Sequence, residues 1–186
     1  MPDAPPGRRR RVWPALLLLG CFAAGALGAY LAVRSGAAPD PCLGAAFVSD
    51  AFGYCVDPPE GWVASQGAAE PTGADAFRIG SAPTVIFVEA VELTDEQGLD
   101  AFVADLRARN EAAGYSPGAP SFGTLAGEPM TQWEMRVSSP EGETVVREIA
   151  VVRGGFGWRL QVADSVERWP TSSREINALL DSWRFA

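Results

Sequence analysis

The sequence predicts an α+β fold in which helices pack on an antiparallel sheet of about six or seven strands, with one transmembrane helix before it. Short runs of β-branched and aromatic residues, separated by clusters of Gly, Pro and Asp, predict the strands. Two segments in which apolar residues recur with a period of about 3.6 predict the helices. A long uncharged apolar run predicts the transmembrane helix.

The apolar run covers residues 12–33 and follows four arginines, Arg8 to Arg11. At about 1.5 Å per residue, a helix of this length is about 33 Å long, which matches a hydrocarbon core of about 30 Å. Because basic flanks stay on the cytoplasmic side, we expect the N-terminus inside the cell and the C-terminal domain outside. The expected parts are a cytoplasmic basic segment (1–11), the transmembrane helix (12–33), a spacer (34–41) and an extracytoplasmic domain (42–186).

Two other fates of the N-terminal segment stay open. Leu18-Leu19-Gly20-Cys21 is similar to a bacterial lipobox, in which Cys21 would be lipidated, although the sequence after it stays apolar. Cleavage of a signal peptide after Ala38 is the other fate, although the apolar run exceeds the usual length of about 7 to 15 residues. All three fates place the domain outside the cytoplasm. The composition, rich in Ala, Gly and Arg and without Lys, is typical of a GC-rich bacterial genome, so we expect a bacterial inner-membrane protein.

The charge of the domain limits its partners. The chain has 15 basic residues, all arginine, and 23 acidic residues. Five of the arginines and one acid lie in the first 34 residues, which leaves the remainder with a formal net charge near −12. Such a surface repels phosphate backbones and anionic lipid headgroups, so nucleic acid is not an expected partner.

The sequence contains no residue set for enzyme catalysis. Histidine and lysine are both absent, which removes Ser-His-Asp, Cys-His, Ser-Lys and Schiff-base arrangements. The acid pairs Glu89 with Glu92 and Glu141 with Glu143 fall at strand ends or a turn tip, where solvated charges are common. We therefore expect no catalytic residue, no cofactor and no metal site.

Cys42 and Cys55 are the only cysteines beyond the apolar run. The expected topology puts them in a compartment where disulfides persist, and no Cys-x-x-Cys motif suggests redox chemistry. A bridge between them would close a loop of about 14 residues and contribute about 3 kcal/mol. We predict a structural disulfide.

The expected strands fall into two groups that flank one helix. The first group covers 52–56, 62–65, 76–79 and 84–91, the last being an inner strand; the second is a meander over 122–125, 129–138, 144–153 and 156–163, with a tight turn at Gly154-Gly155. The first helix is expected to begin with a capping box at Thr94 and Gln97, to carry the apolar stripe Leu99, Phe102, Val103, Leu106 and to stop at Gly114. The second is expected to begin with a capping box at Ser172 and Glu175 and to carry the apolar stripe Ile176, Leu179, Leu180, Trp183.

Tryptophan supplies the one candidate for a binding residue. Trp62, Trp133, Trp158 and Trp183 fall on expected strands or the apolar helix face, where core packing is expected. Trp169 stands before a proline in an expected loop, so we select it as the candidate for contact with a protein partner.

Several motifs occur together in a recognisable order. They are Phe-Gly-Tyr-Cys-Val-Asp-Pro-Pro-Glu-Gly-Trp at 52–62, the helix over 99–113, Leu-Ala-Gly-Glu-Pro at 125–129, the Gly154-Gly155 hairpin and Leu-Leu-Asp-Ser-Trp-Arg-Phe at 179–185. On these motifs residues 51–186 resemble the PsbP-like family. Its α/β/α sandwich is shared by the photosystem II protein PsbP, the Ran-binding Mog protein and many bacterial envelope lipoproteins.

The resemblance implies non-enzymatic roles, as accessory subunits and adaptors. The cysteine pair and the apolar anchor depart from the plant-type member and argue against a photosystem role. The leading hypothesis is a membrane-anchored, non-enzymatic protein-binding or assembly module of the bacterial envelope. The alternative is an envelope protein that binds a small ligand or hydrolyses one with carboxylates. A flat apolar-rimmed face would favour the first, and a deep cleft lined by acids the second.

Overall fold

The computed structural model describes residues 40–69, 73–80, 82–94, 97–140 and 142–186, and Asp40–Ala186 form one compact unit. The expected transmembrane helix over 12–33, and Cys21 within it, lie outside the described residues. In the part of the chain that is described, no helix is long and apolar enough to cross a membrane.

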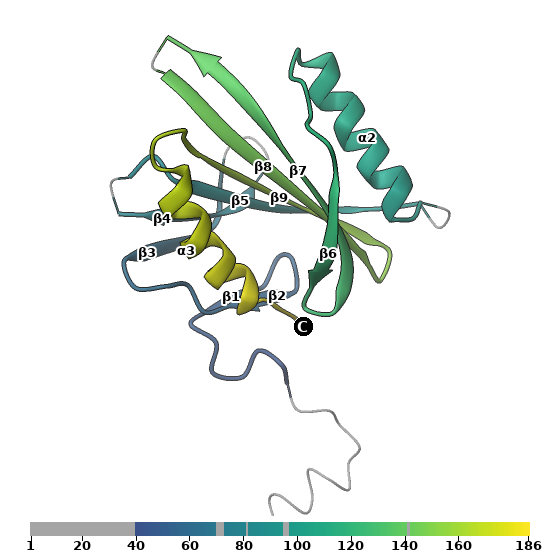
Figure 1. Ribbon diagram of the computed structural model, residues 1–186. Coiled ribbons are helices and arrows are strands. Elements are labelled where there is room, and N and C mark those ends of the chain that lie inside the picture. The colour runs from purple at the N-terminus through teal and green to yellow at the C-terminus, as the bar shows by residue number, and fades with distance from the viewer. Residues whose placement is uncertain (1–39, 70–72, 81, 95–96, 141) are drawn as a thin grey trace, which may run out of the picture. The chain divides into compact units, whose positions relative to one another are not determined.

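A seven-stranded antiparallel sheet dominates the described residues (Figure 1). Its strands are β3 (Trp62–Ala69), β4 (Ala74–Ile79), β5 (Val85–Glu92), β6 (Ser121–Leu125), β7 (Glu128–Ser139), β8 (Gly142–Arg153) and β9 (Phe156–Ser165). Across the sheet they lie in the order β3-β4-β5-β9-β8-β7-β6. The strand number, the inner position of β5 and the β6-to-β9 meander are as predicted, and the pairing of β5 with β9 joins the two groups.

The turn between β8 and β9 lies at Gly154 and Gly155, as the sequence predicts. Their φ angles are +59° and +82°, a region that side chains with a Cβ adopt only at a cost. The tight turn pairs Arg153 with Phe156. Because side chains alternate along a strand, Phe156 and Trp158 then face the same side of the sheet.

A second, three-stranded sheet consists of β1 (Phe47–Ser49), β2 (Tyr54–Val56) and β10 (Arg184–Phe185), with β2 in the middle. The predicted strand at 52–56 is shorter in the structure because the residues before Tyr54 form a turn. There Gly53 has a φ of +65° and donates its N–H to the Ser49 carbonyl at 3.1 Å. The strand β10 lies within the motif at 179–185, where the sequence predicts no strand, and pairs antiparallel with β2.

The predicted disulfide between Cys42 and Cys55 is present, with its Cα atoms 5.6 Å apart. Cys55 lies in β2, and both cysteines are buried. The bridge therefore attaches the segment that enters the domain to the middle strand of the small sheet.

Helices α2 (Leu99–Ala112) and α3 (Trp169–Asp181) lie on opposite sides of the seven-stranded sheet (Figure 1). Alternation along β8 shows the division, because Ala150 packs in the core under α2 while Ile149 packs in the core under α3. The predicted stripe of α2 places Phe102 and Leu106 in its core. The arrangement agrees with the predicted packing of helices on an antiparallel sheet.

The predicted start of α2 is wrong. The Gln97 N–H donates to the Thr94 backbone carbonyl at 2.9 Å in a turn, and the helix begins only at Leu99. The N-cap is Gly98, which has no side chain to cap the helix, so Thr94 is not the N-cap residue. The predicted stop is confirmed, because Gly114 follows the helix with a φ of +86°.

The predicted capping box of α3 is also wrong. The helix begins at Trp169, before Ser172, and Pro170 in its first turn needs no N–H partner there. The Ser172 hydroxyl instead donates back to the Arg168 carbonyl at 3.3 Å, inside the helix. Trp169 is consequently a helix residue and not the loop residue that the sequence predicts.

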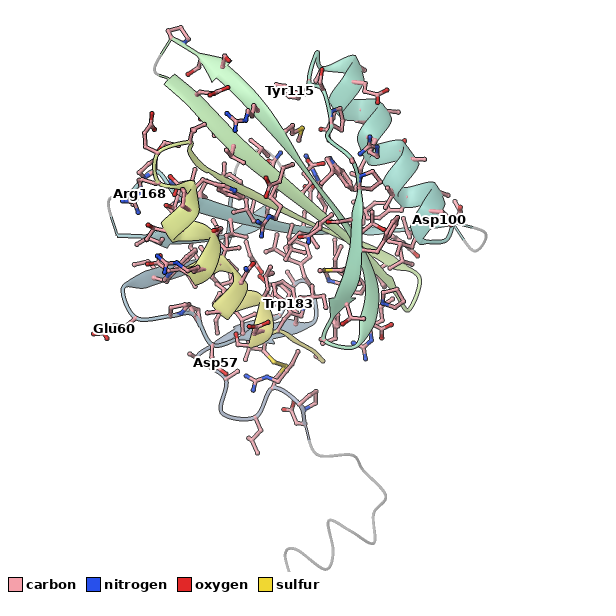
Figure 2. The ribbon with its side chains drawn as sticks, viewed as in Figure 1. Asp57, Glu60, Asp100, Tyr115, Arg168 and Trp183 are labelled. Carbon is pink, nitrogen blue, oxygen red and sulfur yellow. A yellow bond between two sulfur atoms is a disulfide. The ribbon has the colours of Figure 1, made fainter. Side chains whose placement is uncertain are left out.

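The larger core lies between α3 and the two sheets. Trp183, which follows α3 (Figure 2), stacks on Tyr54 with ring centroids 4.1 Å apart. The Tyr54 hydroxyl donates to the buried Asp75 carboxylate at 2.9 Å. Burial first, and the Asp75 charge second, raise the pKa of the Tyr54 hydroxyl above its ordinary value. The predicted burial of Trp133, Trp158 and Trp183 is confirmed.

Candidate functional site

An apolar pocket of about 500 Å³ opens beside the β8–β9 turn. Four separate segments line it, namely the turn before β2, the middle of β5, the β8–β9 hairpin and the residue after β10. Its lining residues are Ala51, Phe52, Gly53, Ala90, Arg153, Gly154, Phe156, Trp158 and Ala186. We call it the aromatic pocket.

The aromatic side chains of the pocket hold one another in place. The Trp158 indole donates its N–H to the Phe52 carbonyl at 3.2 Å. Its ring meets the Phe185 ring edge-on at 5.1 Å and lies 5.9 Å from the Phe156 ring. Trp158 is 6% exposed whereas Phe156 is 44% exposed, so Trp158 belongs to the wall and Phe156 to the rim. The wall is therefore formed before any ligand arrives.

Among the described lining residues of the aromatic pocket, Arg153 has the only charged side chain. Its guanidinium lies 5.1 Å from the Phe185 ring centre and donates through Nη1 to the Ala186 carbonyl at 3.2 Å. Nε lies 3.4 Å from a Glu128 carboxylate oxygen. These contacts hold a positive charge at the edge of an apolar surface.

The lining decides what chemistry the aromatic pocket offers. The side chains of its described lining residues include no carboxylate, hydroxyl or thiol. Hydrolysis by paired carboxylates needs two acids about 5 to 10 Å apart around the substrate, and these side chains supply no such pair. The lining offers apolar contact area and one guanidinium group, and both can contribute to binding a partner or a ligand.

Trp169 lies away from the aromatic pocket. It is half-buried at the first residue of α3, packs against the larger core, and has the Arg147 guanidinium 5.0 Å above its ring. It lines a smaller cavity of about 370 Å³ together with Glu134 and Arg136. Its role in binding a partner stays a prediction.

A buried polar cluster that the sequence did not predict lies on the α2 face of the sheet. The Glu148 carboxylate on β8 is fully buried and accepts hydrogen bonds from Arg159, from Gln161 at 3.3 Å and from Asn110 of α2 at 2.7 Å. Arg159 also contacts Glu89 at 3.0 Å. Burial opposes the charge of Arg159, but the hydrogen bonds and charges of Glu148 and then Glu89 outweigh it and raise its pKa.

The position of Glu148 explains its role. An unpaired buried carboxylate is costly, and here the carboxylate accepts hydrogen bonds from Asn110, Arg159 and Gln161. Glu89, one of the acids considered from the sequence, pairs with Arg159 as a member of this cluster, and exposed Glu143 pairs with Arg136 at 3.3 Å. The cluster therefore fastens α2 to the sheet.

The fold is similar to several solved structures. Cyanobacterial PsbP (CyanoP) from Synechocystis matches over 75% of this chain and 91% of its own, with a TM-score of 0.58 and 16% identity. LpqN of Mycobacterium tuberculosis, involved in cell envelope biogenesis, matches over 74% and 86%, with a TM-score of 0.59 and 14% identity. The domain has a PsbP-like fold. No protein-family model and no curated protein sequence matches the chain.

The aromatic pocket of this PsbP-like domain lies where the motifs of the resemblance meet. Phe52 and Gly53 come from the opening motif, Gly154 from the hairpin, and Ala186 follows the closing motif. The sequence marked these motifs as turns and core, which they are. What it did not reveal is that their ends surround an open pocket.

Proposed function

We propose that this protein is a membrane-anchored, non-enzymatic module of the bacterial envelope whose extracytoplasmic domain binds a protein partner through the aromatic pocket. The observation that carries the proposal is the combination of an exposed Phe156, a buried Trp158 and Arg153 around one apolar pocket. Trp and Arg dominate the energetic centres of protein interfaces, typically in pockets ringed by weaker contacts. Phe is enriched at interfaces too.

The proposed location outside the cytoplasm has two supports. The Cys42–Cys55 disulfide persists in oxidising compartments and is rare in the cytosol. LpqN, which shares the PsbP-like fold, is involved in cell envelope biogenesis. With the predicted helix over 12–33, these features support an anchored domain outside the cell membrane.

The anchor is tested by two measurements. One is the mass of the protein purified from its own membranes, and the other is its cleavage by protease added to cells whose outer envelope is permeabilised while the cytoplasmic membrane stays sealed. If the helix is retained, the mass corresponds to a chain with an unprocessed N-terminus, and the added protease cleaves the domain. A mature chain beginning at lipidated Cys21 replaces the helix with a lipid tether. A chain beginning after Ala38 removes the anchor and contradicts this part of the proposal.

Partner binding is tested by photo-crosslinking from the pocket in native membranes. A photo-reactive residue at Ala51, an exposed lining position, is compared with one at Asp100, an exposed position on α2 (Figure 2). A reproducible protein adduct from position 51 that position 100 does not give supports the proposal. No adduct from position 51, or the same adducts from both positions, counts against it.

Binding of a small ligand is the second candidate, because a volume of about 500 Å³ falls within the range of small-molecule sites, about 300 to 1,000 Å³. The lining without carboxylates gives no support to the hydrolytic form of this alternative. Native mass spectrometry of the domain purified from its source separates the two candidates. A small molecule retained by the wild type and lost on Phe156→Asp would favour the second.

A further inference from the structure

The charged side chain in the described lining of the aromatic pocket is opposite in sign to the net charge of the domain. The chain beyond residue 34 carries a formal charge near −12, whereas that lining side chain is Arg153. A ligand that carried only positive charge would be attracted to most of the surface and repelled at the pocket. A ligand that carried one carboxylate beside an apolar group would meet a complement to both parts at this site.

We infer that the aromatic pocket recognises a partner segment in which an aromatic side chain stands next to an acidic residue. This inference rests on the proposed function and names the chemistry of the partner. The ring enters among Phe52, Phe156 and Trp158, and the carboxylate binds Arg153.

The apolar half of the site favours a ring over a flexible chain. Aromatic pairs gain about 0.5 to 1.5 kcal/mol beyond buried area when rings stack with an offset or meet edge-on. Phe156, on the rim, presents a ring that is 44% exposed, and Trp158 is fixed behind it by its hydrogen bond to the Phe52 carbonyl. An aromatic side chain also loses little conformational entropy on binding, since it has only two rotatable angles.

Arg153, the polar part of the site, has N–H groups that can bind a ligand. A guanidinium carries five N–H groups. The contacts of Arg153 with other described residues engage Nη1, which donates to Ala186, and Nε, which faces Glu128. The Nη2 group has no partner among them, and the side chain of Arg153 is 39% exposed. A ligand carboxylate can therefore bind the guanidinium without breaking the contacts that position it.

Glu128 places a second charge, of opposite sign, beside Arg153. Its carboxylate, 35% exposed, lies 3.4 Å from the Arg153 Nε and competes for the same guanidinium. An incoming carboxylate is repelled by Glu128 and attracted by Arg153. Removing the two charges separately should therefore change affinity in opposite directions, which loss of packing would not do.

The test uses the intact domain in solution and NMR titration, followed at the Trp158 indole N–H and the Phe156 amide. The probes are three capped tetrapeptides: acetyl-Gly-Asp-Phe-Gly-amide, its Asn analogue without the charge, and its Ala analogue without the ring. Decanoate serves as a carboxylate on a flexible chain. The protein variants are Arg153→Gln and Glu128→Gln, and the controls are Arg136→Gln and Glu143→Gln, which remove the charges of an exposed ion pair elsewhere.

The expected result is tightest binding of the Asp-Phe peptide. Arg153→Gln weakens it about fivefold and Glu128→Gln strengthens it about threefold, the scale of half-exposed ion pairs. Neither control variant changes the affinity. Equal binding of the Asp and Asn peptides, or the same change from Arg153→Gln and Glu128→Gln, overturns the inference. Tighter binding of decanoate overturns it in favour of a lipid ligand.

The inference and the proposed function fail separately. An adduct from position 51 with no charge preference among the peptides leaves protein binding standing and overturns the acidic-aromatic specificity. Charge-dependent peptide binding without any adduct in native membranes supports the specificity and counts against the cellular role.

Discussion

The side-chain amide of Asn110 on α2 donates a 2.7 Å hydrogen bond to the buried carboxylate of Glu148 in the middle of β8. Phe102, Leu106 and Asn110 follow one another at intervals of four residues, so the last turn of the helix presents a polar group where the earlier turns present apolar ones. The Arg159 guanidinium donates to the other oxygen of the same carboxylate. The helix is therefore fixed in register as well as packed.

Replacing Asn110 with Ala should loosen α2. The Glu148 carboxylate would lose one donor while it stays buried, which costs about 1 to 3 kcal/mol of unfolding free energy. Chemical denaturation measures the loss, and hydrogen exchange should increase in α2 before the rest of the domain. Asn177→Ala is the control, because Asn177 is exposed although its side chain also makes a hydrogen bond, which it accepts from Arg147 at 3.1 Å. Equal losses from both variants would contradict this account.

Reduction of the disulfide should destabilise the domain without changing its fold. A loop of about 14 residues corresponds to about 3 kcal/mol, or about 6 to 12 °C in Tm for a domain of this size. Because Cys42 and Cys55 are both buried, reductant should act slowly on the native domain. Thermal melting of the wild type and of a Cys42→Ser, Cys55→Ser double variant checks this. An unchanged Tm in the double variant would show that the bridge adds no stability.

Protonation of Asp57 at low pH should lower the stability of the domain. Its carboxylate accepts the Ala46 N–H at 2.8 Å and a 2.8 Å hydrogen bond from Arg184. The backbone bond first, and Arg184 second, outweigh desolvation and hold the pKa of Asp57 below its ordinary value. A depressed pKa gives a contribution that is full above the unfolded value, about 3.9, and is lost as pH falls through the folded value.

The measurement is the difference in Tm between the wild type and Asp57→Asn across a pH series. It should be constant from pH 7 to about 5 and decline below about 4, as protonation removes the advantage of the wild type. A difference that grows toward low pH would have the wrong sign.

Gly157 should tolerate no side chain while Phe102 lies above it. A Cβ on Gly157 would lie 2.8 Å from the Phe102 ring, closer than such contacts occur. Gly157→Ala should cost about 1 to 3 kcal/mol, and Phe102→Leu should recover part of it in the double variant. Gly123→Ala, which meets only the terminal methyl of Met130, should cost less. Strict additivity of the two changes at Gly157 and Phe102 would contradict the packing.

The sequence predicted the strands well because alternation and turn residues are local properties. Gly154 and Gly155 allow little except a tight hairpin, and Gly114 ended its helix as expected. The helix starts were missed for a physical reason. A Ser or Thr with a Glu or Gln three residues on also occurs in turns and inside helices, as Thr94 and Ser172 show.

The site was less predictable than the fold. Phe52, Ala90 and Phe156 stand far apart in the sequence, and each looks like core or turn in its own segment. Their common pocket depends on how the small sheet lies against the large one, which no local pattern encodes. Glu148 did leave a trace, since Arg147 and Glu148 interrupt an otherwise β-branched strand, but only the structure shows which one is buried.

The pairing of β10 with β2 bears on when this domain folds. The Asp57 N–H donates to the Ser182 hydroxyl across a separation of 125 residues, and Trp183 supplies the ring on which Tyr54 stacks. If the domain is exported from its N-terminal end, as we propose, β1 and β2 cross early and β10 crosses last. Until those residues have crossed, the small sheet lacks a strand and the larger core lacks an aromatic face. Under the proposed location, the domain should therefore stay unfolded during export and complete its core only once translocation is nearly finished.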